Sequence, residues 1–173
     1  YSFDFDLRMR LRKKYNLQEK FVLGHVGRMA YQKNPLFILD IFKEAKKKIP
    51  NAVLLYAGDG VLQNEIICHT KKLDLEDSVL FLGNCQNANE LYNVMDAFLL
   101  PSLYEGLPVV GVEAQCNSLP IIMSTAITNE VGIFQYRYIS LENEATYWSK
   151  NLIDLAENSV RNKEDALVAI RKN

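Results

Sequence analysis

The candidate chemistry of this chain is concentrated in two glutamates, Glu105 and Glu113, which are separated by seven residues within the segment PSLYEGLPVVGVEA. An apolar run of strand length, 97–100, precedes this segment, and Pro101 ends the run because proline cannot donate to a strand ladder. Pro108 suits the first turn of a helix, where its missing N–H group is not needed. The pattern predicts a strand, a loop that carries Glu105, and a helix whose second turn carries Glu113.

Glu113 lies among apolar and β-branched neighbours, including Val109, Val110 and Val112. Such a helix is stabilised by burial rather than by helix propensity. A carboxylate that loses its water without gaining a partner costs several kcal/mol, so Glu113 needs one. The partner is either an internal arginine or lysine, or the hydroxyl groups of a ligand that Glu105 also contacts. The spacing alone does not decide between them.

Two basic residues, Arg28 and Lys33, follow the first apolar run, 21–26. Asn34 and Pro35 are expected to be the N-cap and the first residue of the next helix. Loop cations beside the free N–H groups of a helix start attract phosphate groups. Taken by themselves, the two residues are better explained as solvated surface cations.

Two turns have the composition of ligand-binding loops. The turn 58–60, Gly-Asp-Gly, follows the second apolar run, 52–57, and its glycines permit a tight turn with close approach to a ligand. The polar turn 83–86, which contains Asn84 and Cys85, follows the third apolar run. Neither turn is specific by itself.

Apolar runs alternate with segments of helical periodicity along the chain. The expected strands are 21–26, 52–57, 79–82, 97–100, 119–123 and 138–140. The expected helices are 1–18, 36–48, 62–72, one beginning at 87 or 89 that carries Leu91, Tyr92 and Met95, one from 108 onward, 142–157 and 163–172. This order predicts an α/β fold, a Rossmann-like parallel sheet with helices on both faces. The two glutamates, the two cations and the two turns would then share the carboxyl edge of the sheet.

The composition is that of one globular domain, with 173 residues, 49% hydrophobic and 24% charged. A net charge of −1 argues against a nucleic-acid-binding surface, and no apolar run is long enough to span a membrane. Three cysteines without CxxC spacing indicate buried reduced thiols and a cytoplasmic protein. Because the chain opens at Tyr1 and not at methionine, we expect one domain of a larger protein.

Two further features have structural interpretations. His25 lies inside the first apolar run and is expected to be a core or strand-end histidine rather than a catalytic one. The segment Asp4-Phe5-Asp6 has the DxD form of a metal-binding motif, but that motif belongs after a buried strand, and this one precedes a charged helix. The sequence therefore predicts no metal site.

The segment around the two glutamates resembles the signature of retaining nucleotide-sugar glycosyltransferases of family 4, and especially of members from bacterial capsule and exopolysaccharide synthesis. The resemblance runs from about residue 21 to residue 148 and includes GHVGRMAYQKN, LLYAGDG, VLFLGN and DAFLLPS. Members of this family have two Rossmann-like domains that face each other across a cleft, the GT-B fold. The chain is similar to the carboxyl-terminal, donor-binding domain. The resemblance implies that residues 1–20 lead in from a missing amino-terminal domain and that residues 21–173 form the donor domain.

The resemblance also implies roles for the candidate residues. Arg28 and Lys33 would hold the diphosphate of the donor, and Glu105 would contact hydroxyl groups of the transferred sugar. These three would be the catalytic residues, and Glu113 would bind the ribose hydroxyls. The residues whose backbone would contact the donor are Gly27, Gly58, Asn84, Cys85, Gly106, Leu107 and Val109.

The implied activity is transfer of a hexose or N-acetylhexosamine from a nucleotide diphosphate sugar, UDP rather than GDP, to a glycan or lipid-linked acceptor. No metal or cofactor is expected. The missing domain would bind the acceptor and make any contact with the inner face of the cell membrane. A non-catalytic nucleotide-sugar-binding module of the same fold is the alternative. The chain departs from many relatives at Ser118 and Thr125, where glycine and aspartate are common.

Overall fold

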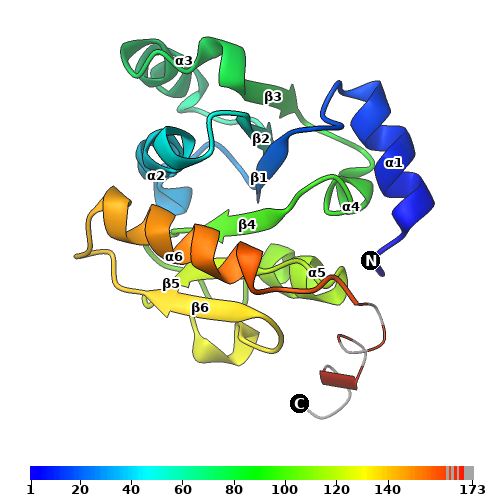
Figure 1. The fold of residues 1–173 in the computed structure, drawn as a ribbon. Coiled ribbons are helices and arrows are strands. Elements are labelled where there is room, and N and C mark those ends of the chain that lie inside the picture. The colour runs from blue at the N-terminus through cyan, green and yellow to red at the C-terminus, as the bar shows by residue number, and fades with distance from the viewer. Residues whose placement is uncertain (163, 165, 167, 170–173) are drawn as a thin grey trace.

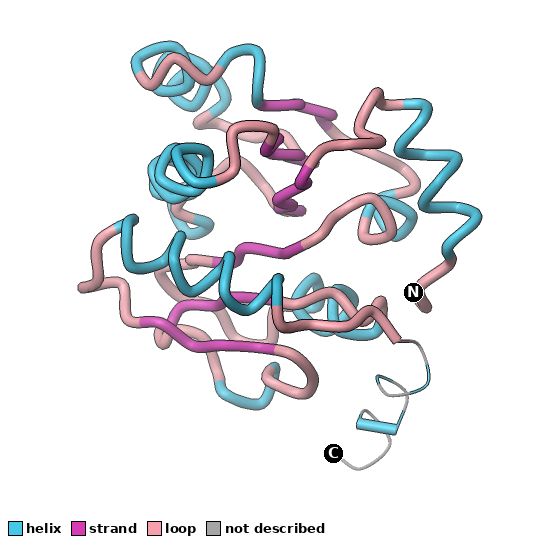
Figure 2. Tube along the Cα trace, in the orientation of Figure 1, coloured by secondary structure: helices cyan, strands magenta, loops and turns pink. Residues whose placement is uncertain are grey.

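The computed structural model describes residues 1–162, 164, 166 and 168–169. Helices and strands alternate along the trace (Figure 2). The strands are β1 (Phe21–Val26), β2 (Ala52–Ala57), β3 (Val79–Gly83), β4 (Ala97–Leu100), β5 (Ile121–Ser124) and β6 (Tyr136–Ile139). The α-helices are α1 (Phe5–Lys14), α2 (Pro35–Lys48), α3 (Gln63–Lys72), α4 (Ala88–Leu91), α5 (Val109–Cys116) and α6 (Ala145–Glu157). Much of the helix predicted over 163–172 lies outside the described residues.

The six strands form one parallel sheet in the order β3-β2-β1-β4-β5-β6. The strand order reverses between β1 and β4, which is the place where folds of this type bind their ligands. These two strands pair at only two positions, Leu23 with Ala97 and Gly24 with Phe98. The predicted Rossmann-like parallel sheet is confirmed.

Helices cover both faces of the sheet, as Figure 1 shows. On one face α2, α3 and α6 pack over a core that includes Ile38, Ile66 and Trp148. On the other face α1, α4 and α5 cover a second core, which includes Leu11 and Ala114. Burial of both sheet faces explains why the strands are nearly continuous apolar runs rather than alternating ones.

The element boundaries differ from the predictions by a few residues. The first helix is shorter than expected and ends at Lys14, and the last strand lies at 136–139 instead of 138–140. Pro108 is not the first helical residue but the extended residue before α5, with ψ of 100°. None of the described helices combines the length and the apolar character that crossing a membrane requires.

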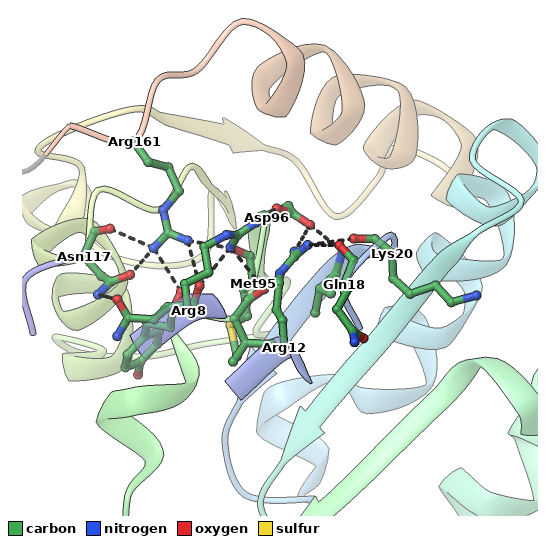
Figure 3. Close-up of polar contacts among 12 residues, drawn as sticks. Arg8, Arg12, Gln18, Lys20, Met95, Asp96, Asn117 and Arg161 are labelled. Atoms are coloured by element: carbon green, nitrogen blue, oxygen red, sulfur yellow. Dashed lines mark hydrogen bonds and ion pairs between the residues drawn. The ribbon is translucent and has the colours of Figure 1, made fainter. Parts of the chain in front are cut away.

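Three arginines hold the turn between α4 and β4, and we call Arg8, Arg12 and Arg161 the arginine clamp. Arg8 and Arg12 each form a 2.5 Å ion pair with Asp96, which begins the approach to β4. Arg161, from the segment after α6, donates to the carbonyl oxygens of residues 92, 93, 95 and 117. Figure 3 shows the three guanidinium groups converging on this turn. Helix α1 is therefore packed against the sheet through these contacts.

Candidate functional site

A cavity of about 230 Å³ opens beyond the carboxyl ends of β1, β2 and β3. Its walls are formed by Val26, Gly27, Arg28, Ala57, Gly58, Asp59, Asn84, Cys85 and Ala88. The structure thus brings together five predicted donor-site residues from three separate loops. A larger groove of about 470 Å³ lies between α2 and α6, away from the strand ends, and none of the predicted site residues lines it.

Gly58 lets two of these loops approach each other closely. Its φ angle is 136°, and a Cβ atom there would lie 2.0 Å from the carbonyl oxygen of Gly27. Its N–H group donates to the carbonyl oxygen of Gly83 at 2.7 Å. A side chain at this position would force the cavity walls apart, so the glycine serves backbone packing at the rim.

Lys33 and Glu105 form an ion pair across the point where the strand order reverses. Lys33 Nζ lies 2.7 Å from Glu105 Oε2, and the two side chains are 15% and 8% exposed. Ser102 Oγ donates to the other carboxylate oxygen, Oε1. An ammonium group has three N–H donors and a carboxylate has about four acceptor positions, so both groups keep capacity for a ligand.

Hydrogen bonds between the two loops fix this pair. Leu103 N–H donates to the carbonyl oxygen of Gln32 at 2.9 Å, and Gln32 Nε2 donates to that of Tyr104 at the same distance. Asn34 precedes α2 as predicted, but its side chain caps nothing. Its φ angle is 54°, and its amide donates to the carbonyl oxygen of Pro101 at 3.3 Å. The side chain predicted to cap a helix instead joins the loops after β1 and β4.

Arg28 is exposed at the cavity and is not among the ion pairs found in the described residues. An exposed guanidinium group can reach an anion in the cavity without first breaking an internal ion pair. Leu107 and Val109 are 58% and 60% exposed at the start of α5. Gly106 is exposed beside them. These three predicted residues flank the site but do not line the cavity.

Glu113 is half-buried in the second turn of α5, and its carboxylate pairs with a tyrosine hydroxyl instead of with an internal arginine or lysine. Tyr92 Oη donates to Glu113 Oε2 at 2.7 Å. Interaction with the Glu113 carboxylate also raises the pKa of Tyr1, whose side chain is largely exposed. No arginine or lysine pairs with Glu113 in the described part of the chain.

His25 is fully buried on β1, as a core histidine should be. Its Nδ1 lies 2.8 Å from the carbonyl oxygen of Leu99 on β4, where the two strands no longer pair. A carbonyl oxygen only accepts, so Nδ1 carries the proton. Burial lowers the pKa of His25 to about 4. The ring is therefore neutral at pH 7 and bridges the two central strands.

The described residues contain no group of three or more histidine, cysteine, aspartate or glutamate side chains arranged to hold a metal ion. Asp4 of the DxD segment accepts a hydrogen bond from Leu7 N–H at 2.9 Å and caps α1. The three cysteines are free, but the prediction that they are buried is wrong. Cys68 is exposed, and Cys85 and Cys116 are half-buried.

Two residues of the site are missing from the sequence-based prediction. Ser102, which donates a hydrogen bond to Glu105, lies three residues before it. Its position in the same short loop could have been used to predict this contact. Tyr92 was expected to point into the core and does, but its hydroxyl also reaches Glu113. No local spacing links these two residues, which are 21 positions apart.

Comparison with known proteins connects this site to a family. The model of the family described as glycosyl transferases group 1 matches residues 8–168. EpsF of Bacillus subtilis (strain 168), which is named as a glycosyltransferase, is 38% identical over 136 residues, which cover 78% of this chain and 35% of that protein. The UDP-Gal:alpha-D-GlcNAc-diphosphoundecaprenol alpha-1,3-galactosyltransferase of Escherichia coli is 36% identical over 110 residues, covering 62% of this chain and 28% of that protein.

Solved structures show the same fold at low sequence identity. The crystal structure of HepE from Anabaena in complex with UDP matches with a TM-score of 0.79 and 21% identity, over 97% of this chain and 50% of that one. WaaG, a glycosyltransferase involved in lipopolysaccharide biosynthesis, matches with a TM-score of 0.80 and 18% identity, over 95% of this chain and 45% of that one.

The chain spans about a third of the length of these curated relatives and about half of these two solved structures. The family model covers nearly all of its described elements, from α1 to the segment after α6. This chain belongs to the glycosyl transferases group 1 family.

Proposed function

We propose that this chain is the donor-binding half of a retaining glycosyltransferase of family 4. It binds a nucleotide diphosphate sugar, with UDP as the nucleotide, and the protein transfers a hexose or N-acetylhexosamine. The observation that carries the proposal is the cavity lined by Gly27, Arg28 and Gly58, which lies at the carboxyl edge where the Lys33–Glu105 pair spans β1 and β4.

The proposed roles follow from the charge that develops in the reaction. Negative charge grows on the leaving diphosphate while the sugar becomes cation-like, so fixed cations aimed at the diphosphate lower the barrier. Arg28 supplies an exposed guanidinium group. Lys33 supplies an ammonium group that is already held in place by Glu105. Retention of the anomeric configuration follows the family pattern.

The carboxylates of Glu105 and Glu113 would bind hydroxyl groups of the sugar and the ribose. Glu105 contacts the transferred sugar and Glu113 contacts the ribose, since a carboxylate accepts hydrogen bonds from neighbouring hydroxyls in a fixed geometry. The loops that carry Gly58, Asn84 and Cys85 border the cavity and would flank the base. The backbone of residues 106–109 would meet the sugar and phosphate at the start of α5.

Binding is proposed to need no metal ion or other cofactor, because two cations and a helix start can neutralise a diphosphate. The test is UDP affinity measured with excess EDTA and then with millimolar Mg²⁺ or Mn²⁺. Equal affinities within about twofold support the proposal, and a loss in EDTA of tenfold or more contradicts it.

The acceptor is proposed to be a glycan or a lipid-linked saccharide of capsule or exopolysaccharide synthesis. The support is similarity to the E. coli galactosyltransferase, whose name describes a diphosphoundecaprenol-linked acceptor. An amino-terminal domain would bind this acceptor. The protein would work in the cytoplasm, peripherally at the inner face of the membrane and without nucleic acid.

Calorimetric titration of the chain with UDP, GDP and ADP tests the donor proposal. UDP is expected to bind, and Arg28→Ala and Glu113→Ala are each expected to weaken it about ten- to a hundredfold, since a charged hydrogen-bond partner is lost. Binding of GDP or ADP in preference to UDP would overturn the choice of base. Absence of binding by the full-length protein would overturn the donor site itself. Binding by the full-length protein without turnover on any acceptor would favour the non-catalytic module.

A further inference from the structure

The proposed role of Glu113, which is to accept hydrogen bonds from a ribose, requires that its carboxylate group be held in one orientation. The terminal torsion of a glutamate is broad and roughly two-fold, so the side chain alone does not aim its oxygens. Accepting hydrogen bonds from a ribose in fixed geometry requires a second group that holds the carboxylate. The structure contains one such group, the hydroxyl of Tyr92, 2.7 Å from Glu113 Oε2.

Tyr92 is rigid for several independent reasons. Its side chain is fully buried, and its ring packs against Phe98 on β4 with centroids 5.7 Å apart. Its carbonyl oxygen accepts a hydrogen bond from Arg161 of the arginine clamp at 3.0 Å. Asp96 and the clamp hold the turn that follows (Figure 3).

Tyr92 is also connected to the cavity through a short helix. It directly follows α4 as its C-cap residue, and Ala88, the first residue of α4, lines the cavity. Burial and the bond to Glu113 raise the pKa of Tyr92, so its hydroxyl keeps its proton and remains a donor.

We propose that Tyr92 is a positioning residue that sets the specificity of the site for a nucleotide with ribose hydroxyls. Its hydroxyl holds Oε2 of Glu113 and turns the carboxylate toward the ribose. Tyr1 also interacts with Glu113, but its side chain is 57% exposed and can be displaced by a ligand, whereas Tyr92 cannot leave the core. This inference rests on the proposed function, in which Glu113 binds the ribose.

The test compares two ligands, UDP and 2′,3′-dideoxy-UDP, which lacks both ribose hydroxyls. Wild-type protein is expected to prefer UDP by about ten- to a hundredfold, the effect of losing hydrogen bonds to a charged group. Tyr92→Phe is expected to reduce this preference about tenfold while leaving the affinity for dideoxy-UDP unchanged within about twofold. A merely structural role would weaken both ligands equally and would overturn the proposal, as would an unchanged preference.

A double-mutant cycle with Glu113→Ala adds a second readout. If Tyr92 acts through Glu113, Tyr92→Phe has no further effect on the preference once Glu113 is alanine. Tyr138→Phe is the matched control, because it also removes a tyrosine hydroxyl that is hydrogen-bonded, to the carbonyl oxygen of Thr128, but on β6. It is expected to leave the preference unchanged. Additive effects of Tyr92→Phe and Glu113→Ala would contradict the proposal.

These measurements distinguish failure of the proposed ribose role of Glu113 from failure of the proposed positioning role of Tyr92. If wild-type protein binds UDP and dideoxy-UDP equally, the ribose role of Glu113 is wrong and this inference falls with it. If wild-type protein prefers UDP and Tyr92→Phe keeps that preference undiminished, only the inference fails. Should Tyr92→Phe not fold, Glu113→Gln is measured, because its amide oxygen can still accept from Tyr92. If Glu113→Gln prefers UDP over dideoxy-UDP no more strongly than Glu113→Ala does, the inference is wrong.

Discussion

Arg28 and Lys33, the two cations proposed to bind the diphosphate, differ in how the protein holds them. Arg28 is exposed, so Arg28→Ala is expected to change the free energy of unfolding by less than about 0.5 kcal/mol. Lys33→Met leaves the Glu105 carboxylate, whose side chain is 8% exposed, without its cation and is expected to cost about 2 kcal/mol. Both variants should lose UDP affinity about ten- to a hundredfold. Urea unfolding and calorimetry measure the two effects.

The double variant Lys33→Met with Glu105→Gln is the control for the larger loss of stability expected of Lys33→Met than of Arg28→Ala. Neutralising both partners removes the uncompensated buried charge, so stability should return to within about 1 kcal/mol of wild type. Affinity for UDP should not return. Recovery of both properties would mean that Lys33 has no direct role in binding.

His25 should make the stability of the protein sensitive to mild acid. Its pKa is about 4 in the folded protein, because of burial, whereas a histidine in water has a pKa of 6.5. Between these values the unfolded chain binds a proton that the folded protein does not, so the free energy of unfolding falls as the pH decreases from about 6.5 to about 4. At 1.4 kcal/mol per pKa unit, the loss is about 3 kcal/mol.

The measurement is urea unfolding of wild type and His25→Gln at pH 7 and at pH 4.5. The variant is expected to be less stable at pH 7, because the Leu99 carbonyl loses its donor, but to lose less stability on acidification. Between pH 7 and pH 4.5 the free energy of unfolding should therefore fall more in wild type than in His25→Gln, by most of the expected loss of about 3 kcal/mol. Parallel profiles would show that His25 is not held neutral.

At the scale of elements, the amino end of β4 depends on Asp96. Its carboxylate pairs with Arg8 and Arg12 of α1 and also accepts a hydrogen bond from Val22 N–H at 2.7 Å. Asp96→Asn leaves two largely buried guanidinium groups without a counter-charge, at an expected cost of about 3 kcal/mol. The midpoint of urea unfolding should fall accordingly.

Lys47→Ala is the comparison for Asp96→Asn, because it also breaks a pair of opposite charges, with Glu44. Lys47 is 57% exposed and lies one turn from its partner on α2. Its loss should change stability by no more than about 0.5 kcal/mol. Equal costs for the two variants would mean that α1 is not held to the sheet by Asp96.

At the scale of the whole molecule, the chain spans only part of its relatives. It covers 35% of EpsF and about half of HepE. The proposed site supplies groups for the donor only, so the chain alone is expected to bind UDP and to transfer no sugar above background. The measurement is UDP release from UDP-sugars in the presence of lipid-linked and soluble saccharide acceptors. Substantial transfer by the chain alone would contradict the assignment of the acceptor site to another domain.

The fold was predictable from the sequence because its signals are local. Apolar runs such as 52–57 and 97–100 coincide with β2 and β4, and glycine, proline and polar turns separate them from helices. The alternation of these elements was enough to predict a parallel sheet. It also placed the loops after the strands on one edge, because parallel strands end on the same side. Boundaries shifted by one to three residues at elements such as α6, where terminal turns depend on neighbours in space.

The sequence by itself determined the sheet and placed the candidate residues in loops that follow its strands. Only the tertiary structure decided the partners of those residues. It paired Lys33 with Glu105, gave Glu113 a tyrosine rather than a basic residue, and left Arg28 exposed. The physical reason is that strand and helix patterns come from neighbours along the chain. A hydrogen bond between side chains 21 or 72 positions apart depends on how the elements pack.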